Sequence, residues 1–171
     1  IGGLIFSIGT TNTHIEWLNK FQTLAKTPLL VTMDAEWGPS QRLSDVFAHP
    51  WNMTLGAIQD NSLVREISKR MAEQNKALGV HYNFSPSVDV NNNSKNPIIG
   101  NRSFGEDPNN VYLKAKAYIQ GHKDAGVFTS IKHFPGHGDT DKDSHKTLPV
   151  IKGDIKRLNN VELYPFKRLI E

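Results

Sequence analysis

The densest group of chemically capable side chains is the stretch from Lys132 to His145, KHFPGHGDTDKDSH, which contains three histidines and three aspartates. It follows an apolar run that is typical of a buried strand, and Pro135, Gly136 and Gly138 indicate a tight, irregular loop. Loops held by a rigid scaffold are common places for catalytic groups. A polar surface loop is the alternative interpretation of the same composition.

Asp143 and His145 are the most suggestive pair in this stretch. They are two residues apart, so in an extended loop their side chains point the same way. A carboxylate that is hydrogen-bonded to one imidazole nitrogen fixes the tautomer of the ring, and the other nitrogen is then free to move a proton near neutral pH. The pair is therefore a candidate general acid/base.

A metal site is the competing interpretation of the same loop. His133, His137 and His145, with the aspartates nearby, could supply nitrogen and oxygen ligands. Their spacing matches no helical ligand pair such as HExxH, and Lys132 would repel a cation. We therefore expect no metal ion here, and nothing in the sequence calls for a cofactor.

Short apolar, β-branched runs predict four strands, and the segments between them predict helices. Glycine follows the second and the third helix, at Gly79 and Gly126, which suits a helix end that needs a positive φ. The strands are expected at 3–6, 29–33, 80–84 and 127–131, and the helices at 14–25, 63–78 and 108–125.

The first helix has two further predicted features. One of the residues 11–13, Thr-Asn-Thr, is expected to cap its N-terminus. Its apolar residues are spaced to form one stripe along the helix: Ile15, Leu18, Phe21 and Leu24.

Alternating strands and helices indicate an α/β protein with a parallel sheet, either doubly wound or closed into a (β/α)8 barrel of the TIM type. The position of the polar residues favours the barrel, because active sites of TIM barrels lie at the C-terminal ends of the strands. Such residues follow three successive strands: Asp34 and Glu36 the second, Asp89 the third, and Lys132 and His133 the fourth.

The number of predicted strands is too small for a closed barrel. A TIM barrel has eight strands in typically about 250 residues, whereas these 171 residues show about four. The last residues, Leu169 to Glu171, fall in a predicted helix. We therefore expect residues 1–171 to form the first half to two-thirds of a catalytic barrel domain, with the remainder beyond Glu171 as a further segment or another chain.

The composition limits the kinds of molecule that the chain is expected to bind. The net charge of +3 comes from basic residues that are spread along the chain among acidic ones, so we expect no nucleic-acid binding. No apolar run approaches the roughly 18 residues that a membrane span needs. The absence of cysteine excludes disulfides and leaves the compartment open.

The string KHFPGHGDTDKDSHKTLP, from Lys132 to Pro149, closely resembles the signature of glycoside hydrolase family 3, in particular of its bacterial β-N-acetylglucosaminidases. The segment MDAEWG, from Met33, is similar to the D-x-E-G-G loop of that family, although Trp37 stands where many members have glycine. Other similar segments keep the family's order and spacing over nearly the whole chain: Gly2–Phe6, Phe84–Val90 and Gly100–Gly105.

The resemblance implies a (β/α)8 barrel enzyme that removes terminal, non-reducing β-linked N-acetylglucosamine with retention of configuration. Its partner would be an N-acetylglucosamine-containing glycan or a peptidoglycan fragment, in the cytoplasm or the periplasm of a bacterium. Carboxylates accept hydroxyl hydrogens, and arginine and lysine donate to hydroxyl oxygens, which suits the side chains that would hold the sugar: Asp34, Arg42, Arg102, Lys132 and His133.

The resemblance further implies that His145, paired with Asp143, replaces the carboxyl group that usually serves as acid/base in glycosidases. It would protonate the leaving oxygen and later deprotonate the attacking water. The nucleophile of the family is an aspartate in a segment similar to F-S-D-D, and no such string follows Leu148. We expect it beyond Glu171, so residues 1–171 alone should be inactive.

Three different functions stay open beside this one. A β-glucosidase of the same family would keep the fold and lack N-acetyl selectivity, although the Asp-x-His pair argues against it. A noncatalytic sugar-binding module would have lost its nucleophile. A phosphorylase is the third possibility, because histidine repels an incoming phosphate less than a carboxylate does. Trp37 is expected either to wall the sugar site or to fill the core.

Overall fold

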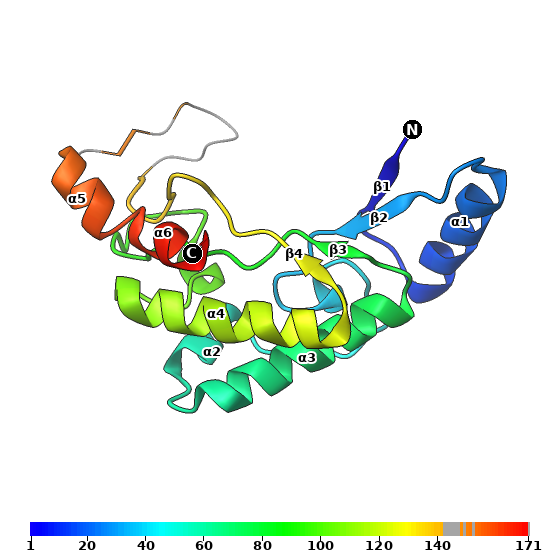
Figure 1. The fold of residues 1–171 in the computed structure, drawn as a ribbon, viewed down its shortest axis with the longest axis horizontal. Coiled ribbons are helices and arrows are strands. Elements are labelled where there is room, and N and C mark those ends of the chain that lie inside the picture. The colour runs from blue at the N-terminus through cyan, green and yellow to red at the C-terminus, as the bar shows by residue number, and fades with distance from the viewer. Residues whose placement is uncertain (142–147, 149, 152, 171) are drawn as a thin grey trace.

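The structure is a computed structural model and describes residues 1–141, 148, 150–151 and 153–170. Four parallel strands form one sheet in chain order, as the sequence predicts (Figure 1). The last two strands are shorter than expected, because a turn at Ser85, whose N–H bonds to the carbonyl of Asn83, interrupts the ladder before Ser87 and Lys132 pair again. The strands are β1 (Gly3–Phe6), β2 (Leu30–Met33), β3 (Tyr82–Asn83) and β4 (Phe128–Thr129).

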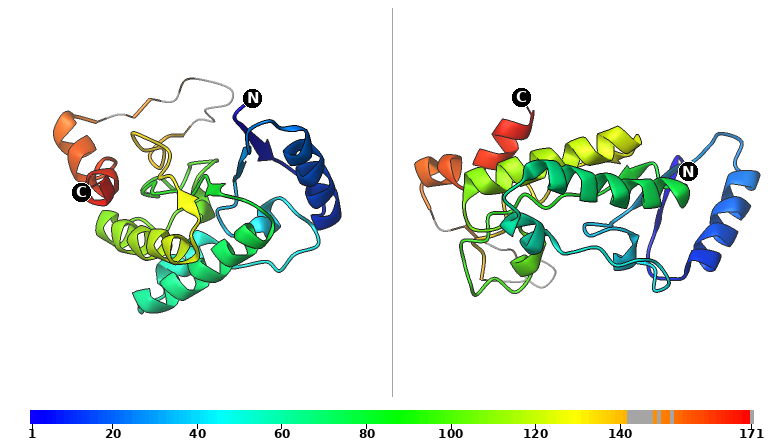
Figure 2. Two further views of the ribbon diagram at one scale, coloured as in Figure 1. Left: turned by 45° about the vertical axis from the view of Figure 1, so that its right-hand side comes forward. Right: turned by 90° about the horizontal axis from the view of Figure 1, so that it is seen from below.

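The three long helices are those that the sequence predicts: α1 (Thr11–Leu24), α3 (Asn61–Ala77) and α4 (Pro108–Ala125). Figure 2 shows α3 and α4 side by side along the sheet, with α1 at one end of the molecule and the C-terminal helices at the other. Shorter helices complete the described chain: η1 (Pro39–Gln41), α2 (Asn52–Ala57), η2 (Gly100–Arg102), α5 (Ile155–Asn160) and α6 (Tyr164–Ile170).

The ends of the helices follow from local side chains. The carboxylate of Asp107 accepts from the N–H of Asn110, and Pro108 at the first position needs no hydrogen-bond partner for its nitrogen, so α4 begins where predicted. Gly79 and Gly126 have φ of 75° and 77°, which confirms their expected role after α3 and α4.

Two expectations for α1 are wrong. Residues 11–13 lie inside the helix, and Thr10 caps it by exchanging hydrogen bonds with Thr13 in a capping box. The predicted stripe is not a buried one, since Ile15 and Leu24 are 40% and 73% exposed. The buried residue of α1 is His14, whose Nε2 donates to the carbonyl of Leu78; this end of the described structure offers α1 too little surface to cover the rest.

A chain of buried polar contacts runs from α3 through α4 to the sheet. Ser68 Oγ donates to the carbonyl of Tyr118 at 2.6 Å, so the contact of 2.8 Å between Ser68 Oγ and His122 Nδ1 must be donated by the imidazole. His122 Nε2 then accepts from Asn83 Nδ2 at 3.0 Å. Asn83 also bonds to both the N–H and the carbonyl of Ala35, so these contacts fix the start of the loop that follows β2.

Apolar packing holds α3 and α4 against the loops that follow the strands. The main cluster joins residues of both helices, of α2 and of α6 to Val88, Val90 and Phe104. A second cluster lies between β2 and the segment around Val80. Within the part of the chain that the structure describes, no helix is both long enough and apolar enough to cross a membrane.

Replacing Gly121 with alanine tests the close approach of α3 and α4. A Cβ at Gly121 would lie 2.3 Å from the carbonyl oxygen of Arg65 and 2.7 Å from the nitrogen of Lys69. Alanine favours a helix by about 1 kcal/mol over glycine, yet we expect the variant to lose about 1–3 kcal/mol of unfolding free energy through overpacking. Urea unfolding measures this. Gly2→Ala, where a Cβ meets nothing within 4 Å, is the matched control.

The burial of His122 makes stability depend on pH. Burial lowers the pKa of His122 from 6.5 to about 4, so the unfolded chain binds a proton there at pH values where the folded one does not. Stability is therefore full above about pH 6.5 and falls as the pH drops towards 4. We expect His122→Gln to flatten the decline of the unfolding free energy between pH 6.5 and 4.5. An unchanged slope would contradict this role.

Candidate active site

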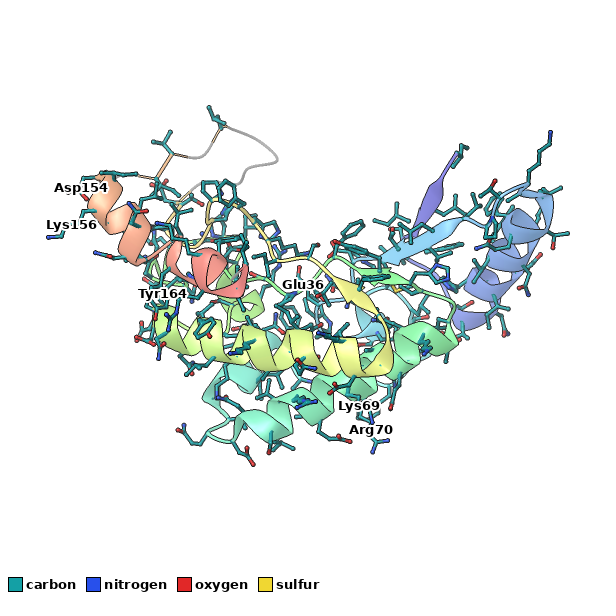
Figure 3. All side chains as sticks on the ribbon, viewed as in Figure 1. Glu36, Lys69, Arg70, Asp154, Lys156 and Tyr164 are labelled. Carbon is teal, nitrogen blue, oxygen red and sulfur yellow. The ribbon has the colours of Figure 1, made fainter. Side chains whose placement is uncertain are left out.

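The polar residues that follow β2, β3 and β4 meet at the C-terminal edge of the sheet, as the sequence predicts. Figure 3 shows Glu36 in the middle of the molecule. Asp34, Glu36, Asp89, Lys132 and His133 are joined directly or through one arginine by hydrogen bonds and ion pairs. Parallel strands place their carboxyl ends at one edge, so residues almost 100 positions apart contact one another.

Asp34 lies between two cations. Arg42 reaches it from the residue after η1, with Nη2 2.8 Å from Asp34 Oδ2 and Nε donating to the Asp34 carbonyl at 2.8 Å. Lys132 Nζ is 2.5 Å from Asp34 Oδ1. The Asp34 side chain is 30% exposed, so it keeps carboxylate surface for a ligand while its orientation is fixed from two sides.

Glu36 is fully buried and holds two cations together. Arg102 makes a two-pronged pair with it, Nη2 to Oε1 at 2.7 Å and Nε to Oε2 at 3.0 Å, and Lys132 Nζ is 3.0 Å from Oε1. Burial alone would lower the pKa of Arg102, but the hydrogen bonds and the charge of Glu36 raise it. The backbone is fixed too, because Tyr118 donates its hydroxyl to the Glu36 carbonyl at 2.9 Å.

Asp89 orients His133, which follows a cis peptide bond after Lys132. The imidazole Nδ1 donates to Asp89 Oδ2 at 2.7 Å, so Nε2 is left to accept from Arg102 Nη2 at 3.1 Å. Burial would raise the pKa of Asp89, yet hydrogen bonds from His133 and from the N–H of His137 hold that pKa below its usual value. His133 is therefore held in one tautomer between an anion and a cation.

Four of the side chains described above, Asp34, Arg42, Arg102 and His133, border a cavity of about 380 Å³. Lys132 is not part of the lining, but its ammonium contacts both Asp34 and Glu36. All five side chains that the sequence analysis assigns to sugar binding are thus brought together. The lining consists of Asp34, Trp37, Gln41, Arg42, Ile98, Arg102, His133 and His137. Charged groups held in advance at one cavity can bind hydroxyls without reorganising.

The two predicted catalytic residues, Asp143 and His145, lie outside the described residues. The described part of the chain holds no group of three or more metal-ligating side chains that could bind a metal ion. The sequence predicts Glu36 and Asp89 at this edge but no role for either. Gln41, which the sequence does not indicate as a site residue, accepts at Oε1 from the N–H of Glu36 at 2.6 Å. Nothing in the sequence marks this last contact.

Comparison with known proteins agrees with this architecture. The family model described as the glycosyl hydrolase family 3 N terminal domain matches residues 2–171. Beta-hexosaminidase A of Pseudoalteromonas piscicida is 35% identical over 182 residues, covering 99% of this chain and 30% of that protein. The chain therefore spans about a third of the length of this relative.

Solved structures of family 3 enzymes and of a phosphorylase also align with nearly the whole of this chain. A family 3 beta-N-acetylglucosaminidase from Paenibacillus sp. str. FPU-7 aligns with a TM-score of 0.92 and 38% identity, over 99% of this chain and 34% of that one. A beta-glucoside phosphorylase aligns with a TM-score of 0.93 and 28% identity, over 99% of this chain and 31% of that one. The expected α/β fold of the TIM-barrel type is thereby confirmed, and the chain belongs to glycosyl hydrolase family 3.

Proposed function

We propose that the protein is a retaining β-N-acetylhexosaminidase that removes terminal, non-reducing β-linked N-acetylglucosamine. The observation that carries the proposal is the cavity at the C-terminal edge of the sheet, where Asp34, Arg42, Arg102 and His133 converge. The likeness of the chain to hexosaminidases of this family supports the same substrate class. N-acetylglucosamine-containing glycans and peptidoglycan fragments are the proposed natural substrates.

The proposed sugar-binding roles follow from the donors and acceptors that the network leaves available. The Asp34 carboxylate is partly exposed and can accept from two sugar hydroxyls. Arg42 and Arg102 are 24% and 21% exposed and can donate to hydroxyl oxygens. Lys132 contributes by holding the Asp34 carboxylate in place. His133 contributes an imidazole that lines the cavity and can contact the sugar.

The proposed chemistry needs a proton donor and a nucleophile. His145, oriented by Asp143, protonates the oxygen of the leaving group while a carboxylate attacks the anomeric carbon and forms a glycosyl-enzyme ester. The same histidine then takes a proton from the water that breaks the ester. Residues 149–171 contain no F-S-D-D-like segment; the proposal therefore assigns the nucleophile to polypeptide beyond these 171 residues, within the same barrel.

A phosphorylase is the second candidate function, and one observation favours it. The phosphorylase among the structural neighbours has the same fold over this region, and in a phosphorylase phosphate replaces the water that breaks the ester. The product is then a sugar phosphate instead of a free sugar. A β-glucosidase and a noncatalytic sugar-binding module differ from the proposed enzyme in substrate or in turnover, so one set of assays separates all four functions.

Hydrolysis of a chromogenic β-N-acetylglucosaminide, compared with the matching β-glucoside, tests the proposed reaction in the complete polypeptide. We expect release from the N-acetyl substrate and, in His145→Ala, a rate lower by about 10²–10⁴-fold, the usual contribution of general acid/base catalysis. Free N-acetylglucosamine should be the product with and without phosphate in the buffer.

Each contrary outcome identifies one different function. Glucoside cleavage at a similar rate means a β-glucosidase, and a sugar phosphate that forms only with phosphate means a phosphorylase. Binding without turnover means a sugar-binding module. A full rate in His145→Ala would remove that residue from the mechanism.

Asp34→Asn tests the sugar-binding role of the central carboxylate. The amide has the same shape but lacks the charge, and hydrogen bonds to charged groups contribute about 1.5–3 kcal/mol. We expect the dissociation constant of N-acetylglucosamine, measured by calorimetry, to rise about 10- to 100-fold. Asp45→Asn is the matched control, because Asp45 accepts from Thr11 instead and does not line the cavity. Equal affinities in both variants would contradict the assignment.

A further inference from the structure

Two of the three tryptophans of the chain are stacked on one another, and one of them, Trp37, lines the cavity. The rings of Trp37 and Trp51 have centroids 4.0 Å apart and planes inclined by 12°. Trp37 lies in the loop after β2, whereas Trp51 immediately precedes α2. The pair therefore joins two loops that are separate in the sequence.

Trp37 also lines the cavity, as the one aromatic carbocycle among mostly charged and polar neighbours. Ile98 is the other apolar side chain of the lining, next to Asp34, Arg42 and Arg102. Trp51 stacks on the Trp37 ring and so helps to fix the plane of the indole that borders the cavity. An indole placed in this way offers an apolar surface opposite groups that bind hydroxyls.

The stack is held in place by the same elements that position Arg102. Asn52, next to Trp51, is fully buried and donates Nδ2 to the carbonyl of Arg102 at 2.9 Å. On the other side, Gly38 has a φ of 84°, and a Cβ there would lie 2.8 Å from the His49 ring. These contacts link the segment that carries Trp51 to the backbone of Arg102 and pack the residue after Trp37 against His49.

Core filling does not explain the pair. Neither tryptophan is a member of the buried hydrophobic clusters formed by the described residues. Trp51 is 43% exposed, although stacking already covers part of its ring. A large, partly exposed apolar surface beside a charged cavity is favourable where a ligand covers it.

A pyranose ring has the complementary surface. Its hydroxyls point outward around the ring, where charged side chains can bind them, and its C–H bonds form an apolar face that packs on an aromatic ring. We infer that the Trp37–Trp51 stack is the platform for the C–H face of the sugar ring in the cavity, and that it selects cyclic sugars over open-chain polyols. The inference rests on the proposed function and adds specificity-determining residues to it.

Calorimetric titration of the complete polypeptide with N-acetylglucosamine, and with its alditol, tests the platform. The alditol carries the same kind of hydroxyls but has no ring face, so it should bind at least about ten-fold more weakly. Trp37→Leu should weaken N-acetylglucosamine binding about ten-fold or more, whereas Trp37→Phe, which keeps an aromatic face, should stay within about three-fold of the parent. Trp51→Leu should lie between them.

Trp17→Leu is the matched control, because Trp17 is 46% exposed and stacked on Phe21 in α1, away from the cavity. It should bind like the parent. If Trp37→Leu binds as the parent does while Asp34→Asn does not, the platform is wrong and the proposed function stands. Equal affinity for the alditol also overturns the platform. If N-acetylglucosamine does not bind at all, the proposed function fails and the platform with it.

Discussion

The buried carboxylate of Glu36 is the constraint on which the site depends. A charge without exposure to water is stable only if cations and hydrogen bonds replace the water. Glu36 meets this need through Arg102, the last residue of η2, and Lys132, in the segment after β4. Its backbone is fixed by Tyr118, and the preceding Ala35 by Asn83. Glu36 and the residue before it thus connect the loop after β2 to η2, to the segment after β4, to α4 and to β3.

Further ion pairs and hydrogen bonds connect Glu36 to the other charged residues of the site. Lys132 links it to Asp34, Arg102 links it to His133, and His133 leads to the second buried carboxylate, Asp89. Every member of this network has at least two partners, so removing one would leave charges of its neighbours unpaired in a region of low exposure. Such networks are costly to disturb and define side-chain positions closely.

The features that could be predicted from the sequence are those set by neighbours in the chain. The bounds of α4 follow from Asp107, Pro108 and Gly126, and the convergence of polar residues follows from the parallel sheet. The predicted cap of α1 is wrong by one to three positions, because three adjacent polar residues obscure Thr10. Ion-pair partners such as Glu36 and Arg102 are 66 residues apart. Their pairing could not be predicted from the sequence, because it depends on how distant loops pack together.

The charge balance of the network has a consequence for the kind of ligand that the site accepts. Among the described residues, three carboxylates, Asp34, Glu36 and Asp89, are paired directly or through His133 with three cations, Arg42, Arg102 and Lys132. This part of the site therefore offers many donors and acceptors in which positive and negative side chains are paired with one another. An uncharged polar ligand can therefore exchange hydrogen bonds with these side chains without leaving a buried charge uncompensated.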